Sequence, residues 1–194
     1  MDKLTRETLF SLEKYAEVRN DFRAEVMAHK RSRRLALGTN ATLYFEDRLT
    51  MQYQVQEMLR IERIFEAAGI AEELDAYNPL IPDGNNWKAT FMVEFPDVAE
   101  RREMLQKLVG IEDHVWMQVD EFEKIRPIAD QDLERDTEDK TSAVHFLQFD
   151  LPPEQIDALK NGASLAAGID HAAYQVEVRP VPDNVRTSLL KDLD

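Results

Sequence analysis

The segment "TFMVEFPDVAERREMLQKLVGIEDHVWMQV" at residues 90–119 has the pattern of a strand, a helix and a strand in succession. The segment "AVHFLQFDLPPEQIDALKNGASLAAGIDHAAYQVEV" at residues 143–178 repeats this order. In each segment the first strand precedes a proline-containing helix start, the helix has a leucine-rich face, and Gly-Ile followed by an acid and His introduces the second strand. Two tandem βαβ units predict a ferredoxin-like core, and the shared features indicate a weak internal duplication.

The residues before these units are predicted to be mainly helical. Tyr15, Val18, Phe22 and Val26 recur at steps of three or four residues. This spacing predicts a helix over residues 11–35 with one apolar face.

A strand and a second helix are expected next. Gly38 is the predicted end of the first helix, and "ATLYFED" at residues 41–47 has the composition of a short strand. The apolar spacing that follows predicts a second helix over residues 50–68, ended by Gly69.

The expected fold class is α+β, with N-terminal helices packed on a ferredoxin-like core. A chain of 194 residues is long enough for one domain, which we expect to span residues 1–194. Its expected parts are a mainly helical portion with one strand at residues 1–80, βαβ units at 88–119 and 143–179, and a charged surface connection at 120–142.

The composition excludes several classes of function. The chain has 38 acidic and 24 basic residues, for a formal net charge of −14, which opposes binding to a nucleic-acid backbone. It contains no cysteine, so it has no disulfide, thiolate nucleophile or cysteine-ligated iron–sulfur cluster. A metal cofactor, such as iron or zinc, would have to be bound by His, Asp and Glu.

The hydrophobic pattern predicts a cytoplasmic protein that does not bind a membrane. No run of eighteen apolar residues occurs, and "MDKLTRETLF" at residues 1–10 lacks the pattern of a secretory signal.

Positive charge is concentrated in "HKRSRRLALG" at residues 29–38. Cations in the last turn of a helix complement its negative end, which explains one or two of them. On the predicted helix, however, Arg19, Arg23, Lys30 and Arg34 fall in one row, where like charges repel one another. A negative group is therefore expected to face this row.

Two kinds of negative group fit that row. Carboxylates of the predicted second helix, Glu57, Glu62 and Glu66, are the favoured partners because ion-pair networks are more often structural than functional. The alternative is a bound small anion or nucleotide, or an acidic partner. The candidate residues for a bound anion are Arg23, Lys30, Arg31, Arg34, Arg60 and Arg63.

The four histidines offer a second candidate site. His114 and His171 occupy equivalent places in the two predicted βαβ units, so they converge if the units are related. With nearby carboxylates they would then form an iron or zinc site. The alternative is that each histidine hydrogen-bonds the backbone at the start of a strand. The candidate metal ligands are His114, His145, His171 and His29, with Glu25.

Four segments together carry a resemblance to a known family. They are "HKRSRRLALG", "FEDRLTMQYQVQEMLRIERIF", "ELDAYNPLIP" and "DKTSAVHFLQF" followed by "DHAAYQ". In this order, over nearly the whole chain, they resemble the bacterial domain-of-unknown-function family 3501. The resemblance implies no catalytic residues. The resemblance also implies a redox or oxidative-stress context. Members of the family that this chain resembles are encoded beside rubrerythrin-like and iron–sulfur oxidoreductase-like proteins.

The leading functional hypothesis is a non-catalytic accessory or interaction protein of a redox system. Its expected partner is a protein, docked on a face of the sheet or on the basic row, and a homodimer is a further expectation by analogy with other ferredoxin-like folds. The alternatives are a His/carboxylate metal-binding enzyme or sensor, and a protein that binds a small anion or nucleotide.

Overall fold

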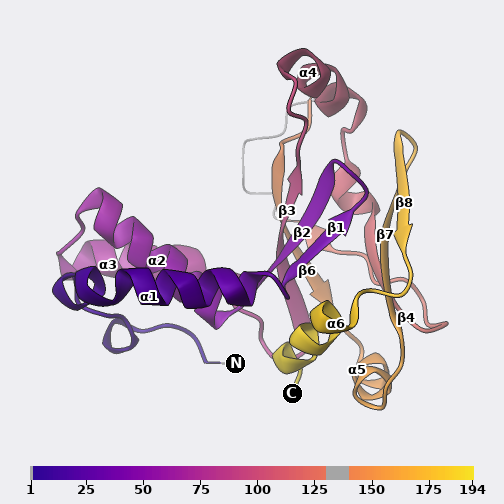
Figure 1. The fold of residues 1–194 in the computed structure, drawn as a ribbon. Coiled ribbons are helices and arrows are strands. Elements are labelled where there is room, and N and C mark those ends of the chain that lie inside the picture. Colours follow the sequence, from indigo (N-terminus) through magenta and orange to yellow (C-terminus); the bar gives the residue numbers. More distant parts are fainter. Residues whose placement is uncertain (1, 130–139) are drawn as a thin grey trace.

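The computed structural model of the chain describes residues 2–129 and 140–194. A helical arm, formed by α1, α2 and α3, projects from a body that contains two β-sheets (Figure 1). The chain is therefore α+β, as predicted.

The arm is built from helices with distinct starts and ends. They are α1 (Leu12–Lys30), α2 (Arg48–Glu62) and α3 (Ala67–Tyr77). The Ser11 hydroxyl accepts a hydrogen bond from the backbone N–H of Lys14 and caps α1. The carboxylate of Asp47 caps α2 by accepting from the N–H of Thr50, and these two residues form a capping box. Apolar faces of the three helices pack on one another and form cores separate from that of the body.

The body contains two sheets that face each other. The first has the strand order β1-β2-β3-β6-β5 and the second has the order β4-β7-β8. Within the described residues, the pairs between these strands are antiparallel. The strands are β1 (Arg34–Leu37), β2 (Ala41–Glu46), β3 (Asn86–Val93), β4 (Val115–Val119), β5 (Ile128–Ala129), β6 (Val144–Asp150), β7 (Leu165–His171) and β8 (Tyr174–Val178).

One hydrophobic core fills the space between the sheets. Leu43 and Phe91 of the first sheet and Val115 and Ile169 of the second belong to the same cluster of buried side chains. Three helices cover the ends of this core: α4 (Val98–Lys107), α5 (Pro153–Lys160) and α6 (Asp183–Leu189). In Figure 1, α4 lies at one end of the body, and α5 and α6 lie at the other.

The ferredoxin-like core is not confirmed. The two strands of the first predicted unit, β3 and β4, lie in different sheets, and so do β6 and β7 of the second. The units are still related in space, because β3 pairs with β6 and β4 pairs with β7. The sequence pattern shows that each strand buries one face, but it does not distinguish a return to the same sheet from a crossing to the facing sheet.

Several predicted boundaries also differ from the structure. Helix α1 ends at Lys30, and the following residues form β1, so residues 1–80 contain two strands rather than one. The second helix ends at Glu62 and is followed by Arg63, which has a left-handed backbone with φ of 57°, and Gly69 lies inside α3. The second predicted unit ends in a hairpin of β7 and β8.

Part of the predicted charged connection at 120–142 is described. It includes β5, whereas residues 130–139 lie outside the described residues. Among the helices that are described, none is long and apolar enough to cross a membrane.

Candidate functional site

A row of side chains crosses the outer face of the first sheet beside the arm. Arg34 pairs with Tyr44, Tyr44 with Thr90, and Thr90 with Phe146. Side chains alternate along each strand, so the neighbours of these residues, such as Leu35 and Leu43, point into the core. The outer-face row therefore carries a cation at the β1 end and an aromatic ring at the β6 end.

The outer-face row forms part of the wall of a cavity at the root of the arm. The cavity has a volume of about 560 Å³ and contains residues of both the arm and the first sheet. Its other lining residues are Met27, Lys30, Arg31, Glu46, Met51, Gln54, Tyr77, Leu80 and Met92. This volume is typical of a site for a small organic molecule.

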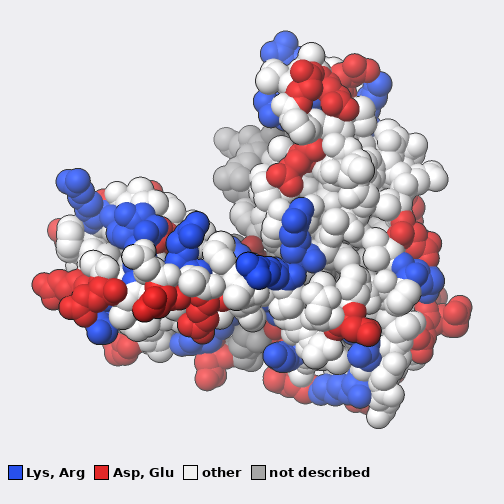
Figure 2. Space-filling view, in the orientation of Figure 1, with Lys and Arg blue, Asp and Glu red and all other residues white. Residues whose placement is uncertain are grey.

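Three cations surround this cavity, and we call them the cationic rim: Lys30, Arg31 and Arg34. Lys30 is the last residue of α1, Arg31 is its C-cap, and Arg34 begins β1. Among the described residues, no carboxylate lies within ion-pair distance of any of the three. Figure 2 shows Lys and Arg side chains gathered at the inner corner where the arm meets the body.

Aromatic rings hold two of the rim cations. The Arg34 guanidinium lies 5.8 Å from the centre of the Tyr44 ring. The Lys30 ammonium lies 5.9 Å from the centre of the Tyr53 ring. Contacts of this kind orient a cation without neutralising it, so the charge of the rim stays available to a ligand.

Arg33, between the rim residues, has the opposite environment. It is 2% exposed, and its guanidinium forms ion pairs with Asp192 at 2.5 Å and with Asp47 at 3.3 Å. It also donates to the backbone oxygens of Phe45 and Glu46. This network fixes the turn between α1 and β1, and so it positions the cationic rim.

The same network extends to the end of the arm and to the C-terminus. The His29 Nε2 atom lies 2.5 Å from an Asp47 carboxylate oxygen. Burial raises the pKa of Asp192 to about 6, although its ion pair with Arg33 opposes this change. The charge of one guanidinium is shared between two buried carboxylates.

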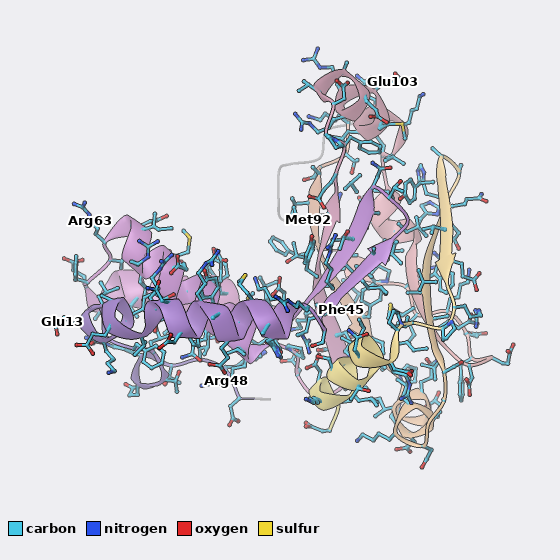
Figure 3. The ribbon with its side chains drawn as sticks, viewed as in Figure 1. Glu13, Phe45, Arg48, Arg63, Met92 and Glu103 are labelled. Atoms are coloured by element: carbon cyan, nitrogen blue, oxygen red, sulfur yellow. The ribbon has the colours of Figure 1, made fainter. Side chains whose placement is uncertain are left out.

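The six predicted anion-binding residues separate into two groups. The structure brings Lys30, Arg31 and Arg34 together around the cavity. Arg23, Arg60 and Arg63 do not line it. In Figure 3, Arg63 lies at the far end of the arm, away from Met92 on the sheet.

Glu57 neutralises the beginning of the predicted row of cations. Its carboxylate accepts from Arg19 at 2.8 and 2.9 Å, from Arg60 at 3.0 Å, and from the Tyr15 hydroxyl at 2.7 Å. The hydrogen bonds from Arg19, above all, lower the pKa of Glu57 to about 2. An internal partner therefore exists for Arg19, as predicted. Glu62 and Glu66, the other predicted partners, form no ion pair with a described cation.

His114 and His171 converge, although not for the predicted reason. Gly168 and His171 lie inside β7, whereas His114 precedes β4, so their places in the two units are not equivalent. The antiparallel pairing of β4 with β7 places the start of one strand beside the end of the other. The centres of the two imidazole rings are 5.1 Å apart.

Both nitrogens of His171 have partners in the protein. Its Nε2 atom lies 3.2 Å from the Val109 oxygen, and its Nδ1 atom accepts from the Ala173 N–H. His114 lies 3.3 Å from Asp170, whose carboxylate also accepts from Arg126 and Lys124. These cations lower the pKa of Asp170, Arg126 most strongly. His171 therefore fits the alternative prediction, in which each histidine hydrogen-bonds the backbone rather than a metal.

The remaining candidate metal ligands lie elsewhere. His145 is buried on β6, with its Nδ1 atom 3.8 Å from Glu112, and His29 pairs with Asp47 rather than with Glu25. Within residues 2–129 and 140–194, no group of three or more His, Asp or Glu side chains is placed to hold a metal ion. The iron or zinc site is therefore not supported by the geometry of these residues.

Most of the cavity wall was not predicted from the sequence. Tyr44 and Glu46 alternate along β2 with Leu43 and Phe45, whose side chains belong to the core, which places Tyr44 and Glu46 on the other face. That pattern identifies the face, but only the strand pairing shows that Thr90 and Phe146 continue it.

Comparisons with known proteins place this fold in a family. Residues 3–193 match the family described as "Protein of unknown function (DUF3501)", so the chain belongs to this family, as its sequence segments indicated. A comparison with curated proteins found no match. A crystal structure from Burkholderia pseudomallei K96243, described as a novel protein of unknown function, is similar over 100% of both chains, with 49% sequence identity and a TM-score of 0.93.

Proposed function

We propose that this protein binds a small organic anion in the cavity at the root of the arm. One observation carries the proposal: the three cations of the rim surround a cavity of about 560 Å³, and no described carboxylate pairs with them. In a chain of net charge −14, such a cluster is the place where an anion is attracted rather than repelled.

The lining of the cavity favours an organic anion over an inorganic one. Met27, Met51 and Met92 line it together with aromatic side chains. Methionine adapts its shape to an apolar surface, and an aromatic ring stacks on a planar one. The anionic group of the ligand would contact the rim, and its apolar body would lie along the outer-face row.

A second cavity, at the free end of the arm, is a weaker candidate. It has a volume of about 450 Å³ and includes Leu9, Ile64 and Phe65. Its charged residues are Arg6, Glu7 and Glu13, which together give no excess of positive charge. We therefore expect an anion to bind in the cavity at the root of the arm rather than in this one.

Thermal stability in the presence of ligands tests the proposal. A compound that binds only the folded chain raises Tm, and the rise grows with the logarithm of its concentration relative to Kd. We expect at least one member of a panel of aromatic and aliphatic carboxylates and phosphates to raise Tm. The double variant Arg31→Ala/Arg34→Ala should lose this rise.

Arg23→Ala is the matched control. Arg23 is an exposed arginine of α1 outside the cavity, so its loss should leave the rise in Tm unchanged. A rise that survives in the double variant, or the absence of a rise with every compound, would contradict the proposal.

An accessory role in a redox system stays a prediction, as do a protein partner, a homodimer and a cytoplasmic location. The redox context rests on the family resemblance, and a ligand-binding cavity is compatible with it. Metal analysis of untagged protein tests the alternative of a metal-binding enzyme or sensor: stoichiometric iron or zinc, lost in His114→Ala/His171→Ala, would support it.

A further inference from the structure

The cavity at the root of the arm contains one carboxylate as well as three cations. Glu46 lines it and is only 7% exposed. Burial of a carboxylate is costly unless a cation or several donors compensate it. The partners of Glu46 therefore indicate what a ligand must supply.

The protein supplies Glu46 with two hydroxyl donors. One carboxylate oxygen accepts from the Thr50 hydroxyl at 2.7 Å, and the other accepts from the Thr90 hydroxyl at 2.8 Å. A carboxylate has about four acceptor sites, so two remain. No described cation lies within ion-pair distance of Glu46.

Neither Lys88 nor Arg34 pairs with the Glu46 carboxylate. Lys88 is opposite Glu46 in the strand pairing, but its ammonium donates to the Pro79 oxygen and pairs with Asp83 at 2.8 Å. The Arg34 guanidinium is held over the Tyr44 ring. The same cavity thus has three cations that pair with no described carboxylate and one carboxylate that pairs with no described cation.

The strand pairing places Arg34 and Glu46 on the same outer face of the first sheet. Arg34 is opposite Tyr44, and Glu46 lies two residues further along β2. One strand spacing and two residues of strand place the Cα atoms of Arg34 and Glu46 roughly 8 Å apart. A molecule that carries both charges at its two ends would pair with both.

We propose, on the basis of the proposed function, that the ligand is a zwitterion: an organic acid with a protonated amine separated from its acidic group by an apolar or aromatic body. The acidic group, a carboxylate or a phosphate, pairs with the cationic rim. The ammonium donates to the free acceptor sites of Glu46. The apolar part of the ligand lies on Tyr44 and on the methionines of the cavity.

Equilibrium dialysis against a small-molecule extract of bacterial cells tests this inference. Full-length wild type, Arg34→Ala, Glu46→Gln and Arg23→Ala are dialysed in parallel, and the retained compounds are identified by mass spectrometry. Wild type and Arg23→Ala should retain the same acids that carry an amine. Retention should fall at least about tenfold in Arg34→Ala and in Glu46→Gln, because each variant leaves one charge of the ligand unpaired. The masses distinguish carboxylates from phosphates.

A chemically altered extract provides a second measurement that does not depend on the folding of Glu46→Gln. Acetylation converts primary amines into neutral amides, so wild type should retain the acetylated compounds at least about tenfold less. Compounds that are lost in Arg34→Ala but lack an amine, or that survive acetylation or Glu46→Gln, would overturn the inference and leave the proposed function intact. If no retained compound depends on Arg34, the proposed function itself fails.

Discussion

Arg33 and Arg34 are adjacent in the sequence but lie in opposite environments. Arg33 is buried between Asp47 and Asp192, and Arg34 is exposed at the cavity. Arg33 lies in the turn before β1, where its guanidinium reaches Asp47 and Asp192, whereas Arg34 is the first residue of β1 and lies on the outer face of the first sheet. Within this cluster of four cations, Arg33 stabilises the joint between arm and body, whereas Lys30, Arg31 and Arg34 line the cavity and pair with no described carboxylate.

The largest expected effect is a difference in stability between variants of these two arginines. Arg33→Met should lower the free energy of unfolding by about 3–5 kcal/mol, because it leaves buried Asp192 without its cation. Arg34→Met should change it by no more than about 0.5 kcal/mol, as is usual for an exposed residue. Urea denaturation of both variants measures the difference. Equal losses would contradict the division between a structural and a binding arginine.

The buried ion pair of Arg33 with Asp192 should also give a characteristic pH dependence. Because the pKa of Asp192 is raised to about 6, the folded protein keeps a proton that the unfolded chain releases. Stability from this group is therefore full below the ordinary carboxyl pKa and decreases as the pH rises to the folded pKa. The stability of wild type relative to Asp192→Asn should fall by about 2–3 kcal/mol from about pH 4 to about pH 7.

Denaturation of the two proteins across this pH range provides the measurement. A difference that stays constant, or grows with pH, would show that Arg33 rather than burial dominates the ionisation of Asp192.

Glu57, in the arm, should give a pH dependence of stability opposite to that of Asp192. Its pKa is lowered to about 2, so the stability that it contributes is present above the ordinary carboxyl pKa and is lost as the pH falls to the folded pKa. Glu57→Gln should cost about 1–2 kcal/mol at neutral pH, and the cost should disappear near pH 2 in acid-denaturation measurements. A cost that does not depend on pH would indicate lost packing rather than a lost ion pair with Arg19.

The smallest expected effect concerns Arg34 alone. Arg34→Lys keeps the charge of the rim but loses the planar group that lies over Tyr44. Retention of the anion in equilibrium dialysis should fall only about two- to fivefold, against at least about tenfold for Arg34→Ala. Identical losses in both variants would mean that the guanidinium geometry, not the charge, determines binding.

The sequence predicted the elements better than their assembly. The spacing of Tyr15, Phe22 and Val26 correctly predicted the buried face of α1. The alternation in "RLAL" at residues 34–37 marks a strand, whereas the helix predicted over residues 11–35 includes the first two residues of this strand. Gly-Ile-acid-His indicated a strand start, yet Gly168 lies within β7, where a side chain would collide with Trp116.

The candidate site could be predicted only in part, because its residues meet through strand pairing between segments far apart in the sequence. The negative group expected to face the row of cations is found for Arg19, which pairs with Glu57, whereas Lys30 and Arg34 pair with no described carboxylate. The position of Glu46 beside the rim depends on strand pairing between distant segments, which periodicity does not encode. His114 and His171 meet through the pairing of β4 with β7, a contact between residues far apart in the chain.

The position of the bound compound tests the central claim most directly. Backbone NMR of the full chain, titrated with the compounds that wild type retains from the extract, maps the contact residue by residue. We predict amide shifts concentrated at Tyr44, Thr90 and Phe146 across the outer face of the first sheet. Shifts confined to Leu9 and Phe65 at the free end of the arm would contradict an anion-binding cavity at its root.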